Sequence, residues 1–194
     1  MARAAILASG SGSNFEAIVK GVSDTDHSVA CLICDRRKAG VFERARRLSI
    51  PSHYVGYYKR ERSEAEKEIS AVLAEYRPDL IVLAGFMRIF TPGFVEAHAG
   101  RIINIHPALL PAHPGARGLE SSFSSPDKRL GVTIHYVDGG TDSGPIICQE
   151  SFERQGTESL VEIEMRIHAI EHQIYPAVVV DLLDARYRHN GSER

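Results

Sequence analysis

A chain of 194 residues is long enough for one domain with a central sheet covered on both faces. Its hydrophobic content of 43% and charged content of 25% are ordinary for a globular protein, and no apolar segment is long enough to span a bilayer. The formal net charge of −2 argues against nucleic acid as the main partner. The apolar run after Arg3 is too short for a secretory signal and meets Ser9 at once, so we expect a cytoplasmic protein.

Short apolar strands alternate with amphipathic helical segments through the first half of the chain. Strands are expected at Ala4–Ala8, Val29–Cys34, Ser52–Val55, Leu80–Ala84 and Ile102–Ile105. Helices are expected over Asn14–Lys20, Val41–Leu48, about Arg60–Tyr76 and Thr91–Ala97. The run Leu80–Ala84 is the most continuously apolar, as expected for the centre of a parallel sheet.

The composition changes after residue 109. Leu110–Asp127 is rich in Pro, Gly and Ser, which predicts a loop or an irregular helix. Val132–Val137 and Ile146–Phe152 predict a hairpin-like pair, and Ser159–Leu183 a closing helix kinked or split at Pro176. The predicted fold class is α/β and Rossmann-like, with a mostly parallel sheet flanked by helices on both faces and a late antiparallel hairpin at one edge. We expect one domain over residues 1–186 and a frayed tail over 187–194.

Three cysteines fit a reducing compartment. Cys31 and Cys34 have C-x-x-C spacing, but they lie in a predicted strand, where a three-residue offset points side chains to opposite faces. We therefore expect buried structural thiols. His168 and His172 are four apart on the closing helix, but no His-Glu-x-x-His pattern accompanies them, so no metal is expected.

The segment Asn104–Pro111 (NIHPALLP) carries two polar side chains at the end of an apolar run. Asn104 and His106 are two residues apart on a predicted strand, so their side chains share a face. The proline that follows turns the chain into a loop. A donor for a developing oxyanion beside a titratable imidazole is what acyl transfer needs. The alternative is a polar strand end before a proline-rich loop.

The first strand–helix junction, Ser9–Asn14 (SGSGSN), consists of small residues. They let backbone amides approach an anion at the helix N-terminus, where the helix dipole favours negative charge. Phe15 stands where a dinucleotide fingerprint needs its third glycine, and no Gly-Lys-Ser/Thr ending is present. The junction therefore favours a single phosphate, with a plain tight turn as the alternative.

Two further segments could complete a site. Ala84–Phe90 (AGFMRIF) places apolar and aromatic groups around one arginine at a strand end, where they either line a slot for a flat heteroaromatic ligand or belong to the core. Val137–Pro145 is a glycine-rich loop that can fold over a site. Either Asp142 or Asp138 could orient His106 and favour its protonated form, although an acidic turn is the plainer interpretation.

These four segments, in the order in which they follow one another along the chain, resemble those of the phosphoribosylglycinamide formyltransferases, the folate-dependent enzymes of purine synthesis. The resemblance extends from Ile6 to Pro176. Asn-Ile-His-Pro is specific to the superfamily that uses formyltetrahydrofolate, and the Gly-Ser-Asn and Met-Arg-Ile segments point to this member. One stretch departs from the family, which usually continues after Pro114-Gly115 with Leu and a His-bearing segment; this chain has Ala116–Glu120 (ARGLE).

The resemblance implies a role for particular residues. Asn104, His106 and Asp142 match the catalytic trio, and Glu171 resembles the acidic residue near the substrate amine. The substrate phosphate would be bound by Gly12, Ser13 and Asn14, and the folate by Arg62, Met87, Arg88, Ile89, Phe90, Val137, Asp138, Gly139, Gly140 and Thr141. No metal is required.

The implied function is transfer of the formyl group of 10-formyltetrahydrofolate to the amine of 5-phosphoribosylglycinamide, by a monomer or homodimer acting on these small molecules. Three alternatives stay open. A formyltetrahydrofolate hydrolase shares the Asn104 and His106 segment but normally carries an N-terminal regulatory domain. A sugar-amine formyltransferase is compatible with the altered 115–120 stretch. A non-catalytic nucleotide-binding module is compatible with the flavodoxin-like alternation of strands and helices.

Overall fold

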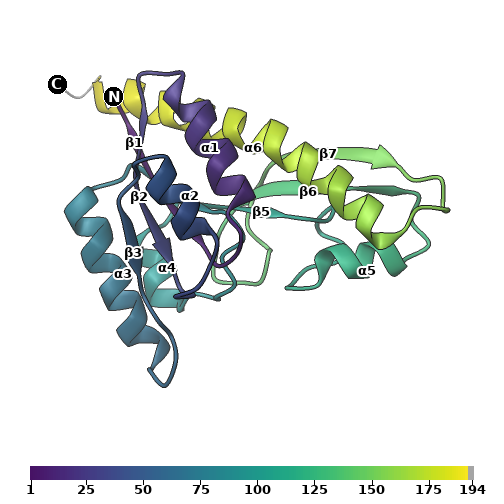
Figure 1. Cartoon of the computed structure of the whole chain (residues 1–194), viewed down its shortest axis with the longest axis horizontal. Coiled ribbons are helices and arrows are strands. Elements are labelled where there is room, and N and C mark those ends of the chain that lie inside the picture. Colours follow the sequence, from purple (N-terminus) through teal and green to yellow (C-terminus); the bar gives the residue numbers. More distant parts are fainter. Residues whose placement is uncertain (192–194) are drawn as a thin grey trace.

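Seven strands form one mixed sheet in the computed structural model, which describes residues 1–191 (Figure 1). The strands are β1 (Arg3–Ala8), β2 (Ser28–Cys34), β3 (Ser52–Tyr54), β4 (Leu80–Leu83), β5 (Ile102–His106), β6 (Arg129–Tyr136) and β7 (Ile146–Glu153). Their order is β3-β2-β1-β4-β5-β6-β7. The pairs among the first five strands are parallel, whereas β5 with β6 and β6 with β7 are antiparallel. The predicted α/β class with a late antiparallel edge is confirmed.

Helices cover both faces of this sheet (Figure 1). They are α1 (Ser13–Ser23), α2 (Val41–Arg47), α3 (Arg62–Tyr76), α4 (Pro92–Ala97), α5 (Gly118–Ser124) and α6 (Leu160–Gly191). Residues of α1, α2 and α6 share one buried core with the sheet, and residues of α3 and α4 share another. Cys34 belongs to the first core and Cys31 to the second, so the two buried thiols lie on opposite faces as predicted.

The strand order reverses between β1 and β4, and the loops that follow these two strands meet. The Ser9 backbone N–H donates to the Gly85 carbonyl at 3.1 Å, and the Met87 N–H donates to Ser9 Oγ at 2.8 Å. In open α/β sheets a ligand typically binds beyond the carboxyl ends of the strands at such a switch point. The fold therefore places the first glycine-rich junction beside the Ala84–Phe90 segment.

The last helix is longer than its sequence pattern predicts. It is one element with Pro176 inside, and it continues to Gly191 rather than ending at Leu183. Its extension is anchored by tertiary contacts, because Asp184 lies 3.0 Å from His27 and Arg186 hydrogen-bonds the Gly100 carbonyl. Residues 187–191 of the tail that we expected to fray are helical, and 192–194 lie outside the described residues.

Two smaller boundaries also differ. The segment predicted as a loop or irregular helix contains the short helix α5, and β6 begins at Arg129 rather than at Val132. The early start of β6 follows from its pairing, because Arg129, Leu130 and Gly131 continue the ladder with β7. Within residues 1–191, no helix is long and apolar enough to cross a membrane.

Candidate active site

Asn104 and His106 lie near the carboxyl end of β5 and line one cavity, as their two-residue spacing predicts. The cavity has a volume of about 310 Å³ and lies at the switch-point end of the sheet. His106 is buried, with 4% of its surface exposed, and Asn104 is half-buried. A rigid strand thus holds an amide and an imidazole at the wall of a partly enclosed space.

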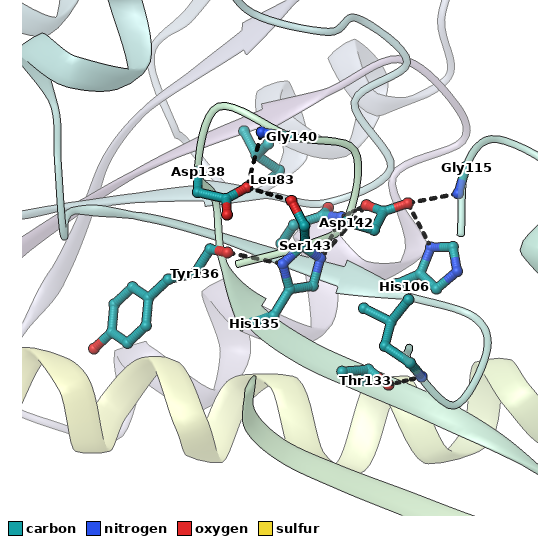
Figure 2. Close-up of polar contacts among 12 residues, drawn as sticks. Leu83, His106, Gly115, Thr133, His135, Tyr136, Asp138, Gly140, Asp142 and Ser143 are labelled. Carbon is teal, nitrogen blue, oxygen red and sulfur yellow. Dashed lines mark hydrogen bonds and ion pairs between the residues drawn. The ribbon is translucent and has the colours of Figure 1, made fainter. Parts of the chain in front are cut away.

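Asp142 joins this pair from the loop between β6 and β7 (Figure 2). Its Oδ2 lies 3.4 Å from Nδ1 of His106 and accepts a 2.7 Å hydrogen bond from the Gly115 N–H. Its Oδ1 lies 3.5 Å from Nδ2 of Asn104. Asp138 instead accepts hydrogen bonds from Gly140 and Ser143 within its own loop. Of the two carboxylates that the sequence left open, the structure brings Asp142 to His106.

His135 is a fourth member of this cluster, which sequence reasoning missed. It lies directly opposite Asn104 in the antiparallel β5–β6 ladder. Its Nδ1 donates to the Tyr136 carbonyl at 2.8 Å, and its Nε2 faces Asn104 Nδ2 at 3.3 Å and Asp142 Oδ1 at 3.5 Å. His135 therefore contacts both the amide and the carboxylate through one ring nitrogen. A histidine inside an otherwise apolar strand is the signal that could have found it.

The environment of Asp142 keeps its carboxylate ionised. The hydrogen bond with His135, the hydrogen bond from the Gly115 N–H and the charge of the nearby His106 lower the pKa of Asp142 to about 2, against the opposing effect of burial. Asp142 also has a positive φ of 52°, a backbone conformation that is uncommon for residues other than glycine. The loop is thus held in an unusual conformation that presents a permanent negative charge to His106.

This lowered pKa predicts a pH-dependent contribution to stability. A carboxyl group whose folded pKa lies below its unfolded value of about 4 stabilises the folded state above pH 4, and this contribution disappears as the pH falls towards 2. We expect Asp142→Asn to reduce the free energy of unfolding by about 2 kcal/mol at pH 7. Urea unfolding of both proteins between pH 7 and pH 3 should show the difference shrinking; a constant difference would contradict this account.

The imidazole of His106 is also held from the loop that follows β5. Its Nε2 donates to the His113 carbonyl at 2.7 Å, so each ring nitrogen faces a hydrogen-bond acceptor. Gly118 packs against the same ring, since a Cβ built on it would lie 2.5 Å from His106 Nε2. The 115–120 stretch, which departs from the family pattern, therefore contacts the site through Gly115 and Gly118.

Adding a methyl group at residue 118 should displace the His106 ring. We expect Gly118→Ala to lower kcat at least about tenfold, because a misplaced general acid or base loses much of its effect. Gly93→Ala is a matched control, since a Cβ on this helical glycine meets nothing within 4 Å. Steady-state kinetics on both variants would test this. Equal activities would mean that the His106 position does not limit the reaction.

Most of the predicted folate residues line the same cavity as the trio. These are Met87, Arg88, Ile89, Phe90 and the loop residues Val137, Asp138, Gly139, Gly140 and Thr141. Met87 and Ile89 are exposed, at 55% and 64%, and both border this cavity. Arg88 is held by Asp35, with Nε 2.5 Å from the carboxylate. Arg62 is exposed at the start of α3 and is not among the lining residues.

The glycine-rich junction and Glu171 form a second cluster. Nδ2 of Asn14 donates to Oε2 of Glu171 at 2.9 Å, across 157 residues of sequence. Gly12 has φ 82°, and a Cβ there would lie 2.5 Å from a methyl of Val41, so the turn into α1 requires glycine. Glu171 is buried, and burial raises the pKa of its carboxyl group. Among the described residues, Oδ1 of Asn14 is buried without a hydrogen-bond partner.

The two clusters supply polar groups at the switch point of a Rossmann-like α/β fold. Among residues 1–191, no group of three His, Cys, Asp or Glu side chains is placed to hold a metal ion. The arrangement offers hydrogen-bond donors, an imidazole and carboxylates beside a largely apolar cavity. It defines the class of α/β group-transfer enzymes that act through such side chains.

Comparison with known proteins identifies the family. Residues 2–179 match the family described as formyl transferase. The chain is 44% identical over 191 residues to a Bacillus subtilis protein named phosphoribosylglycinamide formyltransferase, covering 97% of this chain and 98% of that protein. An Escherichia coli protein of the same name is 35% identical, covering 94% and 88%. A Bacillus halodurans crystal structure of that name has a TM-score of 0.89 at 42% identity, covering 93% and 95%.

The chain belongs to the formyl transferase family. The predicted resemblance and the prediction of a formyltransferase enzyme are both confirmed.

Proposed function

We propose that this enzyme transfers the formyl group of 10-formyltetrahydrofolate to the amine of 5-phosphoribosylglycinamide, a step of purine biosynthesis. The names of its relatives support formyl transfer and the phosphoribosylglycinamide substrate, and the folate donor is what the resemblance to that family implies. The observation that carries the proposal is the convergence of Asn104, His106 and Asp142 on one wall of the switch-point cavity.

The Asn14–Glu171 cluster fits the amine substrate. A phosphate at Gly12–Asn14 would face backbone N–H groups at the start of α1. The unpartnered Oδ1 of Asn14 and the carboxylate of Glu171 are both acceptors, which suits an amine that carries two or three hydrogens. Together these groups could fix both ends of a phosphorylated amine.

The switch-point cavity fits the folate. Its apolar lining, which includes Phe86, Val95 and Val137, suits the flat face of a pterin ring, and the exposed Met87 and Ile89 would be covered by the ligand. Backbone groups of residues 137–141 supply polar contacts for the ring edge. Both partners of the reaction would then meet at the carboxyl end of β5.

The reaction follows from this arrangement. The substrate nitrogen attacks the formyl carbon, forming a C–N bond and a tetrahedral oxyanion. Asn104 Nδ2 and protonated His106 donate to that oxyanion, and one such donor typically contributes about 3–4 kcal/mol to lowering the barrier. A proton then passes from the attacking nitrogen, with Asp142 and His106 assisting, to the folate nitrogen as its bond to the formyl carbon breaks.

The loop after β5 must adjust during this cycle. Nε2 of His106 is engaged by the His113 carbonyl at 2.7 Å. The His113 side chain is itself held by Ser121 at 2.9 Å and Asp127 at 3.2 Å. For His106 to donate through Nε2 to the oxyanion, this carbonyl has to be displaced, so substrate binding and a shift of residues 107–117 are coupled.

Glu171→Gln should weaken binding of the amine substrate. Removing the negative charge while keeping the shape is expected to raise KM for 5-phosphoribosylglycinamide about tenfold or more, with a smaller change in kcat. Glu164→Gln, on the exposed side of the same helix, is the matched control. Steady-state kinetics with saturating folate would measure both. An unchanged KM would remove Glu171 from the binding site.

A turnover assay with 10-formyltetrahydrofolate, run with and without 5-phosphoribosylglycinamide, tests the proposal. We expect release of tetrahydrofolate that depends on the amine. Equal release without the amine would indicate a formyltetrahydrofolate hydrolase, and no release in either case would indicate a binding module. Release only with an amino sugar nucleotide in place of the ribosylglycinamide would indicate a sugar-amine formyltransferase.

A further inference from the structure

A second, larger cavity lies at the opposite end of the sheet from the active site. It has a volume of about 910 Å³ and is bordered by the ends of α3 and α6. Asp79 and Arg101, which immediately precede β4 and β5, line its floor. The active-site residues follow the carboxyl ends of these parallel strands, so the two cavities are separated by the length of the sheet.

Three arginines from different elements line this cavity. Arg77 follows α3, Arg101 precedes β5 and Arg186 belongs to α6. Arg101 hydrogen-bonds Nδ1 of His98 at 2.8 Å, and Arg186 hydrogen-bonds the carbonyl of Gly100. Both acceptors are neutral, so neither bond compensates the positive charge.

The balance of charge in the lining is positive. Asp79 is the one carboxylate among the lining residues, and it accepts a 2.8 Å hydrogen bond from the Arg3 backbone N–H. Burial and the charge of Arg101 lower the pKa of His98, and they also lower the pKa of Arg186 against the opposing effects of Tyr136 and Asp79. Three guanidinium groups thus line a partly dehydrated place in which Asp79 is the one carboxylate of the lining, and a bound anion would relieve the remaining repulsion between Arg101 and Arg186.

Two further features of the cavity suit a phosphorylated ligand: the backbone conformation of Arg77 and an apolar wall beside the arginines. Arg77 has φ 47°, at a helix end where glycine is the usual residue. Leu73, Ile81 and Leu182 form an apolar wall beside the guanidinium groups. Guanidinium forks match phosphate oxygens, and an apolar wall suits the organic part of a small molecule.

We propose that this cavity, lined by Arg77, Arg101 and Arg186, is a second anion site that binds the phosphate group of a small molecule. It is distinct from the phosphate-binding turn at Gly12–Asn14, and it does not depend on the function proposed for the active site. The phosphate could belong to an inorganic phosphate or to a nucleotide whose base lies against the apolar wall.

Titration of the ¹⁵N-labelled full-length chain with pyrophosphate tests the site. We expect saturable amide shifts at Gly100, Arg101 and Leu182, separate from any shifts at residues 12–14. Calorimetry should show that Arg101→Gln and Arg186→Gln each weaken binding about five- to tenfold. Arg46→Gln is the control, since that exposed arginine pairs with Glu43 elsewhere on the surface, and it should leave the affinity unchanged.

The same experiments can overturn the proposal. Shifts confined to residues 12–14, no saturation up to about 10 mM pyrophosphate, or equal weakening by Arg46→Gln would each refute it. If Arg186→Gln fails to fold because its bond to Gly100 is lost, Arg77→Gln provides the test, since this side chain is exposed. If ADP and pyrophosphate bind equally tightly, the site recognises the phosphate group alone. If ADP binds more tightly, the site recognises a nucleotide. Both outcomes support the proposal.

Discussion

Asp142→Asn is expected to lower kcat about 100- to 10,000-fold, the range typical of losing a group that orients a general acid–base. Oδ2 of Asp142 lies 3.4 Å from His106 Nδ1, and its Oδ1 faces Asn104 and His135, so one carboxylate aligns three side chains. An asparagine keeps the size but removes the charge that favours the imidazolium form. Steady-state kinetics with both substrates saturating would measure the loss.

Asp138→Asn separates this role from a general effect of the loop. Asp138 lies four residues away and accepts hydrogen bonds only within its own loop in the described contacts, from Gly140 at 3.0 Å and Ser143 at 2.8 Å. We expect its replacement to change kcat far less, with any larger effect on KM for the folate. Similar losses in the two variants would show that loop order, not the Asp142 charge, is responsible.

His106→Asn is the second large expected effect. Asparagine places its amide nitrogen where Nδ1 of the imidazole lies and can still donate to Asp142, but it cannot titrate, so kcat should again fall about 100- to 10,000-fold. The dependence of the remaining activity on pH should also lose the limb that an imidazole produces. The measurement is a pH profile of kcat for both proteins.

Measuring the unfolding temperature of each variant separates a loss of catalysis from a loss of folded protein. His106 is buried, so a modest loss of stability is expected, and activities should be compared well below the transition. His53→Ala is the control for the loss of a packed imidazole. His53 lies on β3, is half-buried and contacts Tyr76 of α3. A His106→Asn protein that folds and turns over near the wild-type rate would contradict the assigned role.

The fold was largely predictable because its signals are local. Continuous apolar runs such as Leu80–Leu83 and the Thr91–Pro92 helix start need only short windows of sequence to interpret. The length of α6 was not predictable, because it depends on contacts between residues far apart in the sequence, such as Asp184 with His27. Helix α5 was obscured by a segment whose Gly and Ser content is typical of loops.

The site was predictable only in part. The Asn104 and His106 pair follows from a two-residue spacing, but His135 comes to Asn104 through an antiparallel register that no spacing specifies. The choice of Asp142 over Asp138 depends on a loop with a left-handed residue, which brings a particular carboxylate to the ring. The role of Gly115 and Gly118 likewise depends on how the loop after β5 returns to His106.

In the proposed reaction the formyl group passes directly from the folate to the amine at Asn104, His106 and Asp142. A single turnover with 10-formyltetrahydrofolate carrying ¹³C in the formyl group, quenched and analysed by mass spectrometry, tests this transfer. We predict that the label appears in the formylated ribosylglycinamide, with none bound to the protein, and that Asp142→Asn and His106→Asn slow its appearance equally strongly. Label found on the protein, or released as formate at the same rate with and without the amine, would contradict it.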